Sequence, residues 1–274
     1  MRHGSPGLGG QCHALGRGPG ARGTLGGNPA RIVALIGGWS GGPPGRLRLA
    51  CQIGLNRSAS HPMRPLNELI NETEPALPLV HDWIAGAAVQ CEILPPSPRN
   101  DDVLLALQVT TRSPMGAIAH GTGGLLLDGG WLRVLGSGHP RLPRDLAGWN
   151  AGRADGLLLV ADDAAGGFFA LNGGALGDDP GMLYYRAPDN LQWEALELGY
   201  SDFLQAMLAG RIEDFYAALR WPEWQADVKA LGPDQCFSFY PFLWTQEGSP
   251  AASSRKAVDI AEHYALTLGV DVGH

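Results

Sequence analysis

Short apolar runs alternate with glycine- and aspartate-rich turns through the middle of the chain. The runs LLLVA (157–161) and FFALN (168–172) are each too short for a typical helix. The segment between them, DDAAGG (162–167), and the segment NGG (172–174) carry the residues that tight turns with positive φ require. Apolar runs of this length, bounded by such turns, are typical of strands joined as hairpins. The sequence therefore predicts an antiparallel meander.

Helices are predicted on both sides of this meander. Apolar residues recur at helical spacing before it and after it, at 65–71, 77–89, 202–209, 212–219 and 260–268. The block GAIAHGTGGLLLDGGWLRVLG (116–136) is interpreted as part of the meander, and further strands are expected at 89–94, 182–185 and 191–196. Two segments stay open: 103–109 is either helix or strand, and CFSFYPFLW (236–244) is either loop or strand. Strands in the middle with helices at both ends are typical of an α+β fold, here with a central, mostly antiparallel sheet.

The first 62 residues differ in composition from the rest. They hold 16 of the 40 glycines, seven arginines and no acidic residue. Such a segment cannot bury enough apolar surface to offset the entropy lost on ordering. We therefore expect a Gly/Arg-rich leader at 1–62, either disordered or upstream sequence before a natural start at Met63, and a single α+β domain at 63–274. A nucleic-acid-binding arm and a targeting segment are the alternatives for the leader.

The other 212 residues hold 13 basic and 27 acidic residues, a formal net charge of −14. This charge would repel phosphate, so we expect no nucleic-acid partner. No apolar stretch reaches the roughly 18 residues of a membrane span, so no membrane partner is expected either. The four cysteines lack metal-ligand spacing, which fits a cytoplasmic protein without a metal or other cofactor.

Glycine-rich strings that resemble ligand-binding motifs lack the context these motifs need. Gly18–Gly23 fits the dinucleotide pattern without its flanking strand and helix, and Gly38–Gly42 fits a nucleophile elbow but runs into Pro43-Pro44. DDAAGG lacks the Lys and Ser or Thr of a phosphate loop. We therefore assign Gly166, Gly167, Gly173 and Gly174 to backbone turns.

One basic patch stands out in the acidic remainder. Arg133, Arg141 and Arg144 lie close in sequence to His139. They are candidates for binding an anion, or alternatively for pairing with nearby carboxylates.

Four large aromatic residues lie near predicted turn ends and are candidate contact anchors for a partner: Trp131, Trp149, Tyr184 and Trp193. Large aromatics are readily buried, so a place in the core is the alternative for each of them.

Several stretches match a known family: GGWLRVLGSG (129–138), LAGWN (146–150), VADDAAGGFFALNGGALG (160–177), YYRAPDNLQWE (184–194), YSDFL (200–204), FYAALRWPEW (215–224) and FSFYPFLW (237–244). On these motifs the chain from Met63 onwards resembles the bacterial family of unknown function numbered 2625. The family's pattern begins near MRPLNELI, which implies a start at Met63. The resemblance implies no known activity and no catalytic residues.

A looser resemblance covers about 146–210. The order of strand, glycine-rich turn, F-x-L-N, strand with YY, strand and Ser-Asp-Phe-Leu helix is similar to the SUKH superfamily of bacterial immunity and regulatory proteins. That resemblance implies an α+β sheet that binds protein partners.

Two functions of different classes follow. The first is a non-enzymatic protein-binding module, immunity- or regulator-like, whose −14 charge favours a basic protein partner. The second is an unrecognised enzyme, such as a hydrolase, whose pocket gathers His120, His139 or His263 with Asp and Ser from distant parts of the chain.

Overall fold

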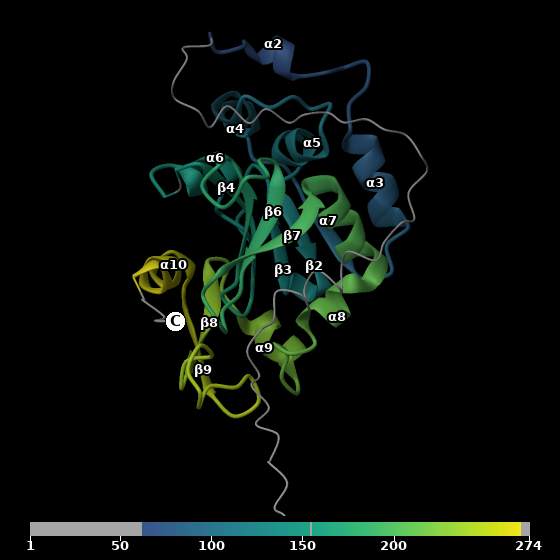
Figure 1. Ribbon diagram of the computed structural model, residues 1–274. Helices are drawn as coiled ribbons and strands as arrows, with labels where there is room; N and C mark the ends of the chain where they lie inside the picture. Colours follow the sequence, from purple (N-terminus) through teal and green to yellow (C-terminus); the bar gives the residue numbers. More distant parts are fainter. Residues whose placement is uncertain (1–61, 154, 270–274) are drawn as a thin grey trace, which may run out of the picture.

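The computed structural model of the protein describes residues 62–153 and 155–269 (Figure 1). The predictions for residues 1–61, including both glycine-rich motifs there and two of the four cysteines, lie outside the described residues. Among the helices of the described part, none has the length and apolar character needed to cross a membrane.

The predicted meander is confirmed as a seven-stranded sheet. Every neighbouring pair is antiparallel, and the strand order in space is the order in the chain. The strands are β1 (Cys91–Leu94), β2 (Gly124–Leu127), β3 (Leu132–Leu135), β4 (Leu157–Asp163), β5 (Phe168–Asn172), β6 (Met182–Arg186) and β7 (Trp193–Gly199). A second sheet pairs β8 (Gln235–Tyr240) with β9 (Ser254–Asp259).

Helices precede and follow the meander, which confirms the α+β class. Those before β7 are α2 (Leu66–Leu69), α3 (Leu77–Ala85), α4 (Asn100–Leu107), α5 (Pro114–Gly121), the short η1 (Asp128–Gly130) and α6 (Leu146–Asn150). Those after it are α7 (Tyr200–Ala206), the π-helical η2 (Met207–Arg211), α8 (Ile212–Tyr216), α9 (Trp224–Ala230) and α10 (Ile260–Leu268). Figure 1 shows α7 and α10 on opposite sides of the sheet.

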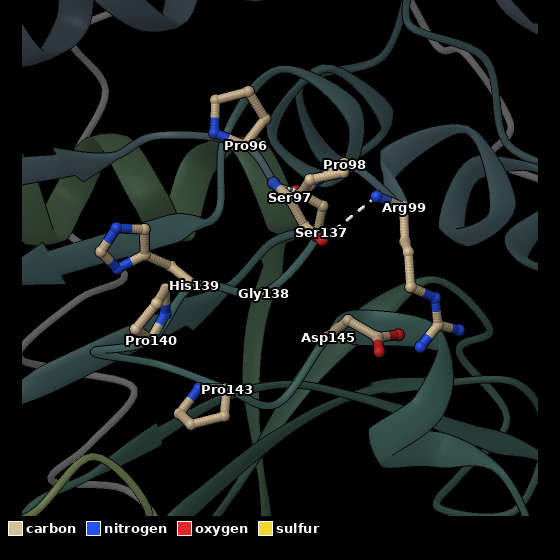
Figure 2. A pocket seen from close by; sticks show the side chains of 10 residues that line it. All are labelled: Pro96, Ser97, Pro98, Arg99, Ser137, Gly138, His139, Pro140, Pro143 and Asp145. Atoms are coloured by element: carbon tan, nitrogen blue, oxygen red, sulfur yellow. Dashed lines mark hydrogen bonds between the residues drawn. The ribbon is translucent and has the colours of Figure 1, made fainter.

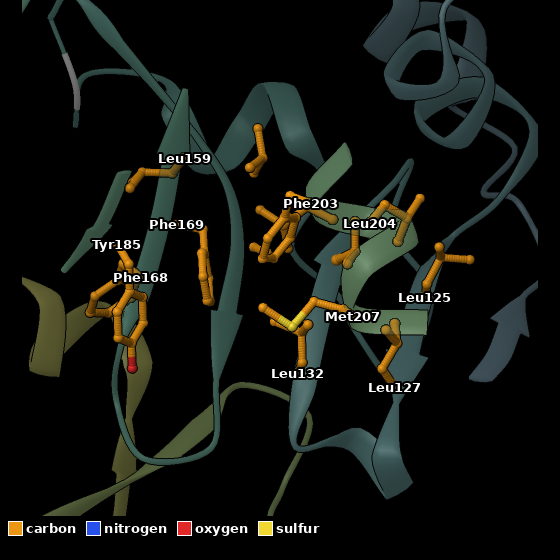
Figure 3. Close-up of a cluster of buried hydrophobic side chains, with 14 of the residues drawn as sticks. Leu125, Leu127, Leu132, Leu159, Phe168, Phe169, Tyr185, Phe203, Leu204 and Met207 are labelled. Atoms are coloured by element: carbon orange, nitrogen blue, oxygen red, sulfur yellow. The ribbon is translucent and has the colours of Figure 1, made fainter. Parts of the chain in front are cut away.

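Both faces of β5 are covered. All five of its residues are buried, so neither face of the strand meets solvent. A half-exposed strand would instead alternate between buried and exposed residues. Phe169 packs on Phe203 of α7, with ring centroids 4.8 Å apart, while Phe168 packs on Tyr264 of α10 at the same distance. Because successive side chains point to opposite faces of a strand, one face meets α7 and the other meets α10. Figure 3 shows Phe169 with Phe203 of α7 in the buried cluster.

The start of the block 116–136 is helical, so its assignment to the meander is wrong there. Ser113 accepts a hydrogen bond from the Gly116 amide as a cap, and Pro114 occupies the first position of α5. Both residues favour a helix start. The meander begins only at β2. The open segment 103–109 is helical up to Leu107, where α4 ends.

At the C-terminal end, the open aromatic segment forms a strand, β8, up to Tyr240. Its partner β9 was not predicted, because its sequence SRKAVD lacks apolar alternation. The helix expected at 202–209 begins two residues earlier, at Tyr200, without a side-chain cap. Leu191 has a positive φ and precedes β7 instead of opening it.

We expect the two phenylalanines of β5 to be equally important for stability. Phe168→Ala and Phe169→Ala should each lower the free energy of unfolding by roughly 3–5 kcal/mol, because each leaves a cavity in a closed layer. Met182→Ala, at a side chain 37% exposed, is the control and should change it by less than about 0.5 kcal/mol. Denaturant titration measures all three. A small loss for only one phenylalanine would show that its face of the sheet is open.

Candidate functional site

A cleft of about 310 Å³ lies between the segment after β1 and the segment after β3. Its walls include four prolines, Pro96, Pro98, Pro140 and Pro143. Its polar side chains come from Ser97, Arg99, Ser137, His139 and Asp145 (Figure 2). The cleft thus brings together a serine, a histidine and an aspartate, as the enzyme hypothesis requires.

The hydrogen bonds in this cleft are structural. The Ser137 hydroxyl donates to the Thr122 carbonyl oxygen at 2.7 Å and accepts from the Ser97 amide at 2.9 Å. Asp145 caps α6 by accepting from the Gly148 amide at 2.6 Å. Figure 2 shows the His139 ring turned away from Asp145. A nucleophile needs a base within hydrogen-bond reach, and here these groups support local turns instead.

The other two candidate histidines lie elsewhere. His120, at the end of α5, contacts Asp101 at 2.8 Å. His263 is buried in α10 beside the β4–β5 turn, and its burial lowers its pKa to about 4. The structure therefore does not bring the three histidines into one pocket.

The basic patch predicted around His139 is dispersed. Arg133 and Arg144 are buried and share one carboxylate, that of Asp162. Arg141 is exposed and pairs with Glu92 of β1. The alternative, pairing with nearby carboxylates, is the one observed for these three arginines, and buried guanidinium groups require such pairing.

The two buried arginines form an ion centre with Asp162. The Arg133 Nε donates to Oδ1 of Asp162 at 2.6 Å, and the Arg144 Nη2 donates to Oδ2 at 2.8 Å. Arg133 also donates to the Gln235 carbonyl oxygen at 2.6 Å, and Arg144 contacts the exposed carboxylate of Asp234. We call these residues the Asp162 centre. Its contacts hold the end of β4 against the start of β8.

The adjacent Asp163 organises the β4–β5 turn. Its Oδ1 accepts from the amides of Ala165 and Gly167, both at 2.9 Å, and its Oδ2 accepts from the Tyr185 hydroxyl at 2.8 Å. Burial raises the pKa of Asp163 above its ordinary value, while the bonds from Gly167 and Tyr185 act against that rise. Both aspartates thus act in folding the turn.

Two of the four assigned turn glycines have the expected positive φ, 90° at Gly166 and 115° at Gly174. Gly167 is needed for space, because a Cβ there would collide with Asp163 and the Tyr185 hydroxyl. Gly173 is not among the glycines with positive φ.

Burial contradicts the choice of contact anchors. Trp131 is fully buried against Tyr216, Trp221 and Trp224, with ring centroids between 4.9 and 5.5 Å from its own. Trp149 is 5% exposed and Tyr184 is 7% exposed. Their alternative place, in the core, is the one observed. Trp193, at the start of β7, is half-buried.

One exposed and two half-buried aromatic side chains lie instead at the end of β8 and just after it. Tyr240 is 72% exposed, and the rings of Phe242 and Trp244 stack with centroids 4.3 Å apart and an interplanar angle of 8°. Tyr240 lies 6.2 Å from Phe242. We call these three residues the aromatic turn. The sequence signal was present in CFSFYPFLW, but the pattern did not show which of its aromatics point outward.

The loop that carries the aromatic turn is held by its own hydrogen bonds. The Ser253 hydroxyl donates to the Pro241 carbonyl oxygen at 2.8 Å, and the Ser254 hydroxyl donates to that of Tyr240 at 3.0 Å. The Thr245 hydroxyl donates to the Phe242 carbonyl oxygen at 2.8 Å. The aromatic turn is therefore ordered without a partner.

Most basic residues of the described part are paired with a carboxylate, whereas most carboxylates have no basic partner. Eight of the 13 basic residues after position 62 already contact a carboxylate: Arg99, Arg112, Arg133, Arg141, Arg144, Arg211, Arg220 and Arg255. They use eight of the 26 carboxylates in residues 62–153 and 155–269; within those ranges the other 18 have no arginine or lysine partner. Uncompensated negative charge thus dominates. The same residues contain no group of three His, Cys, Asp or Glu side chains that could hold a metal ion.

Comparisons with known proteins identify a matching family and similar proteins. The model of a family described as "Protein of unknown function DUF2625" matches residues 66–263. An uncharacterized protein of Escherichia coli (strain K12), YbfG, is 49% identical over 207 residues, which cover 73% of this chain and 94% of that protein. An uncharacterized protein of Haemophilus influenzae is 41% identical over 212 residues, covering 74% of this chain and 92% of that protein. No solved structure matches.

The two positive-φ glycines offer a test of the turn assignment. Gly174→Ala should cost about 1–2 kcal/mol of unfolding free energy from backbone strain alone, since nothing lies within 4 Å of its Cβ position. Gly166→Ala should cost clearly more, because its Cβ would also collide with Nε2 of His263. Thermal and denaturant unfolding measure both.

The double variant Gly166→Ala/His263→Ala provides the control, because it removes the collision and leaves the strain. Equal losses for Gly166→Ala and Gly174→Ala would contradict the packing role of Gly166. Nucleotide binding that Gly166→Ala abolishes at unchanged stability would contradict the turn assignment itself.

Proposed function

The chain belongs to the DUF2625 family, and on this premise we propose that it is a non-enzymatic protein-binding module whose partner is a basic protein. The observation that carries the proposal is the aromatic turn, in which the exposed ring of Tyr240 adjoins the half-buried, stacked rings of Phe242 and Trp244. Aromatic residues are enriched at the energetic centres of protein interfaces.

The order of the loop supports this role. A binding surface that is already fixed in the free protein loses less conformational entropy when a partner docks. The hydrogen bonds from Thr245, Ser253 and Ser254 hold the backbone on both sides of Phe242. Tyr240 and the Phe242–Trp244 stack therefore present a nearly rigid apolar contact.

The surface charge supports a basic partner. Among the 18 carboxylates without an arginine or lysine partner, all but the buried Asp163 and Glu194 lie at the described surface and give it a negative field. Such a field speeds association with a positively charged protein and disfavours acidic ones. An exposed carboxylate near the aromatic turn is that of Glu247, in the same loop. The aromatic residues would supply binding affinity, and the carboxylates would supply specificity for a basic partner.

An immunity-like or regulatory role inside the cell completes the proposal. The resemblance of 146–210 to the SUKH superfamily suggests a module that acts by covering a partner. A cytoplasmic location is supported by Cys91 and Cys236, both present as free thiols, because reducing compartments keep thiols free.

The proposal is tested by affinity capture with the full chain from lysate of the bacterium that encodes it. The bound proteins are identified at about 50 mM and about 500 mM salt, where screening differs strongly. We expect a basic partner that is retained less well at high salt. In a titration with that purified partner, Tyr240→Ala/Trp244→Ala should weaken binding by at least about 30-fold, the loss typical of interface hot spots.

Leu266→Ala is the matched control, since Leu266 is a large apolar side chain, 51% exposed, on α10. It should bind as the wild type does. An acidic partner, or a basic partner whose binding is unchanged in Tyr240→Ala/Trp244→Ala, contradicts the proposal. Turnover of a small molecule that Ser137→Ala abolishes at unchanged stability would favour an enzyme acting in the cleft of Figure 2.

A further inference from the structure

The outer edge of β9 is open among the described residues. The second sheet has two strands, and β8 lies on only one side of β9. The other edge of β8 faces the body, where the Phe237 amide donates to the Ala164 carbonyl oxygen at 2.8 Å and the Gln235 carbonyl accepts from Arg133. The outer edge of β9 therefore faces away from the body.

The register shows which backbone groups of β9 point outward. In an antiparallel pair, facing residues alternate between two arrangements. They either exchange hydrogen bonds with each other or point their amide and carbonyl groups away from each other. The Phe237 amide points away from β9, so its facing residue Ala257 also points its amide and carbonyl outward. Arg255, two residues earlier, does the same. No residue of the described ranges donates to or accepts from the backbone of Arg255 or Ala257.

This edge is more regular than the other strand edges of the described sheets. β1 is only four residues long. β7 is interrupted, with Glu197 at a φ of 56° and a register shift against β6. β9 has six residues, all paired in continuous register, with no proline and no bulge. Open, regular edges are templates for adding another strand.

We propose that β9 is a self-association edge, on which a second copy of the chain pairs its own β9 antiparallel across a two-fold axis. The register is centred on Ala257, so that Ala257 faces Ala257 of the second copy. The two β8–β9 hairpins then form one four-stranded sheet. This proposal concerns the edge of β9 and is independent of the partner proposed for the aromatic turn.

Charge complementarity selects this register. Centred on Ala257, the pairing places Arg255 opposite Asp259 of the second copy, twice by symmetry, and Lys256 opposite Val258. Arg255 also contacts Asp227 of its own chain, and Asp259 also caps α10 through Oδ1, so the new pairs would add to these contacts. Opposite charges facing each other across strands are stabilising, and like charges are destabilising. The alternative centred on Lys256 would also use the outward groups of Arg255 and Ala257, but it would place Lys256 against itself. The repulsion between the two Lys256 side chains thus excludes the register centred on Lys256 and leaves the one centred on Ala257.

The side chain at the two-fold axis is that of Ala257, which is small enough to let the two β9 strands approach closely. Facing residues that exchange hydrogen bonds have Cα atoms about 5.5 Å apart, which lies within the range that a disulfide spans. Lys256 and its copy would be diagonal neighbours at roughly 7–8 Å, beyond the reach of a disulfide. A cysteine at either position therefore reports the register.

The experiment uses the full chain with Cys12, Cys51 and Cys91 replaced by serine, and with the buried Cys236 retained. Ala257→Cys and Lys256→Cys are made separately in this background. Under mild oxidation, we expect most of the Ala257→Cys protein to form a covalent dimer on a non-reducing gel. Lys256→Cys should form at least about tenfold less. Sedimentation of the wild type over a range of concentrations should show a monomer–dimer equilibrium.

Because both substitutions lie on an exposed strand edge, folding is checked by the melting temperature of each reduced variant. A monomer at all concentrations, with no covalent dimer of Ala257→Cys above that of Lys256→Cys, overturns the proposal. A covalent dimer formed mainly by Lys256→Cys overturns the register. A dimer in sedimentation with neither crosslink places self-association elsewhere and also overturns it.

Discussion

The buried carboxylate of Asp162 joins parts of the chain that are far apart in sequence. It pairs with Arg133 of β3 and with Arg144, which precedes α6, and these arginines in turn contact Gln235 and Asp234 at the start of β8. A buried charge is costly unless it is fully paired, so removing one member leaves the others uncompensated. The aromatic turn and the open edge of β9 both belong to the β8–β9 unit, so their placement on the body depends on this centre.

The sheet was largely predictable because its signals are local. Short apolar runs and turns such as Gly166-Gly167 are set by neighbouring residues, so β4 and β5 were found near their true bounds. β9 and the start of α5 were missed for two reasons. The sequence of β9 is polar because one edge and one face meet solvent, and the cap at Ser113 outweighed the glycine-rich pattern that follows it.

The candidate site was less predictable because it depends on contacts between distant segments. Arg133, Arg144 and Trp131 could equally have been surface groups; their burial follows from Asp162, 18 to 29 positions away, and from aromatic residues of α8 and α9. Conversely, the exposure of Tyr240 follows from the fold of its loop, in which the Ser253 and Ser254 hydroxyls donate to the carbonyl oxygens of Pro241 and Tyr240. A sequence pattern contains the residue types of such contacts but not their partners.

Hydrogen exchange of the Asp162→Asn variant tests most directly whether the Asp162 centre holds the β8–β9 unit. The key amide is that of Phe237, which donates to the Ala164 carbonyl oxygen. Local opening exposes amides without global unfolding. We predict faster exchange throughout β8 and β9, protection retained in β5, and no change in the control Asp102→Asn, which alters an exposed ion pair. Exchange in β8 and β9 equal to that of the wild type would contradict the account.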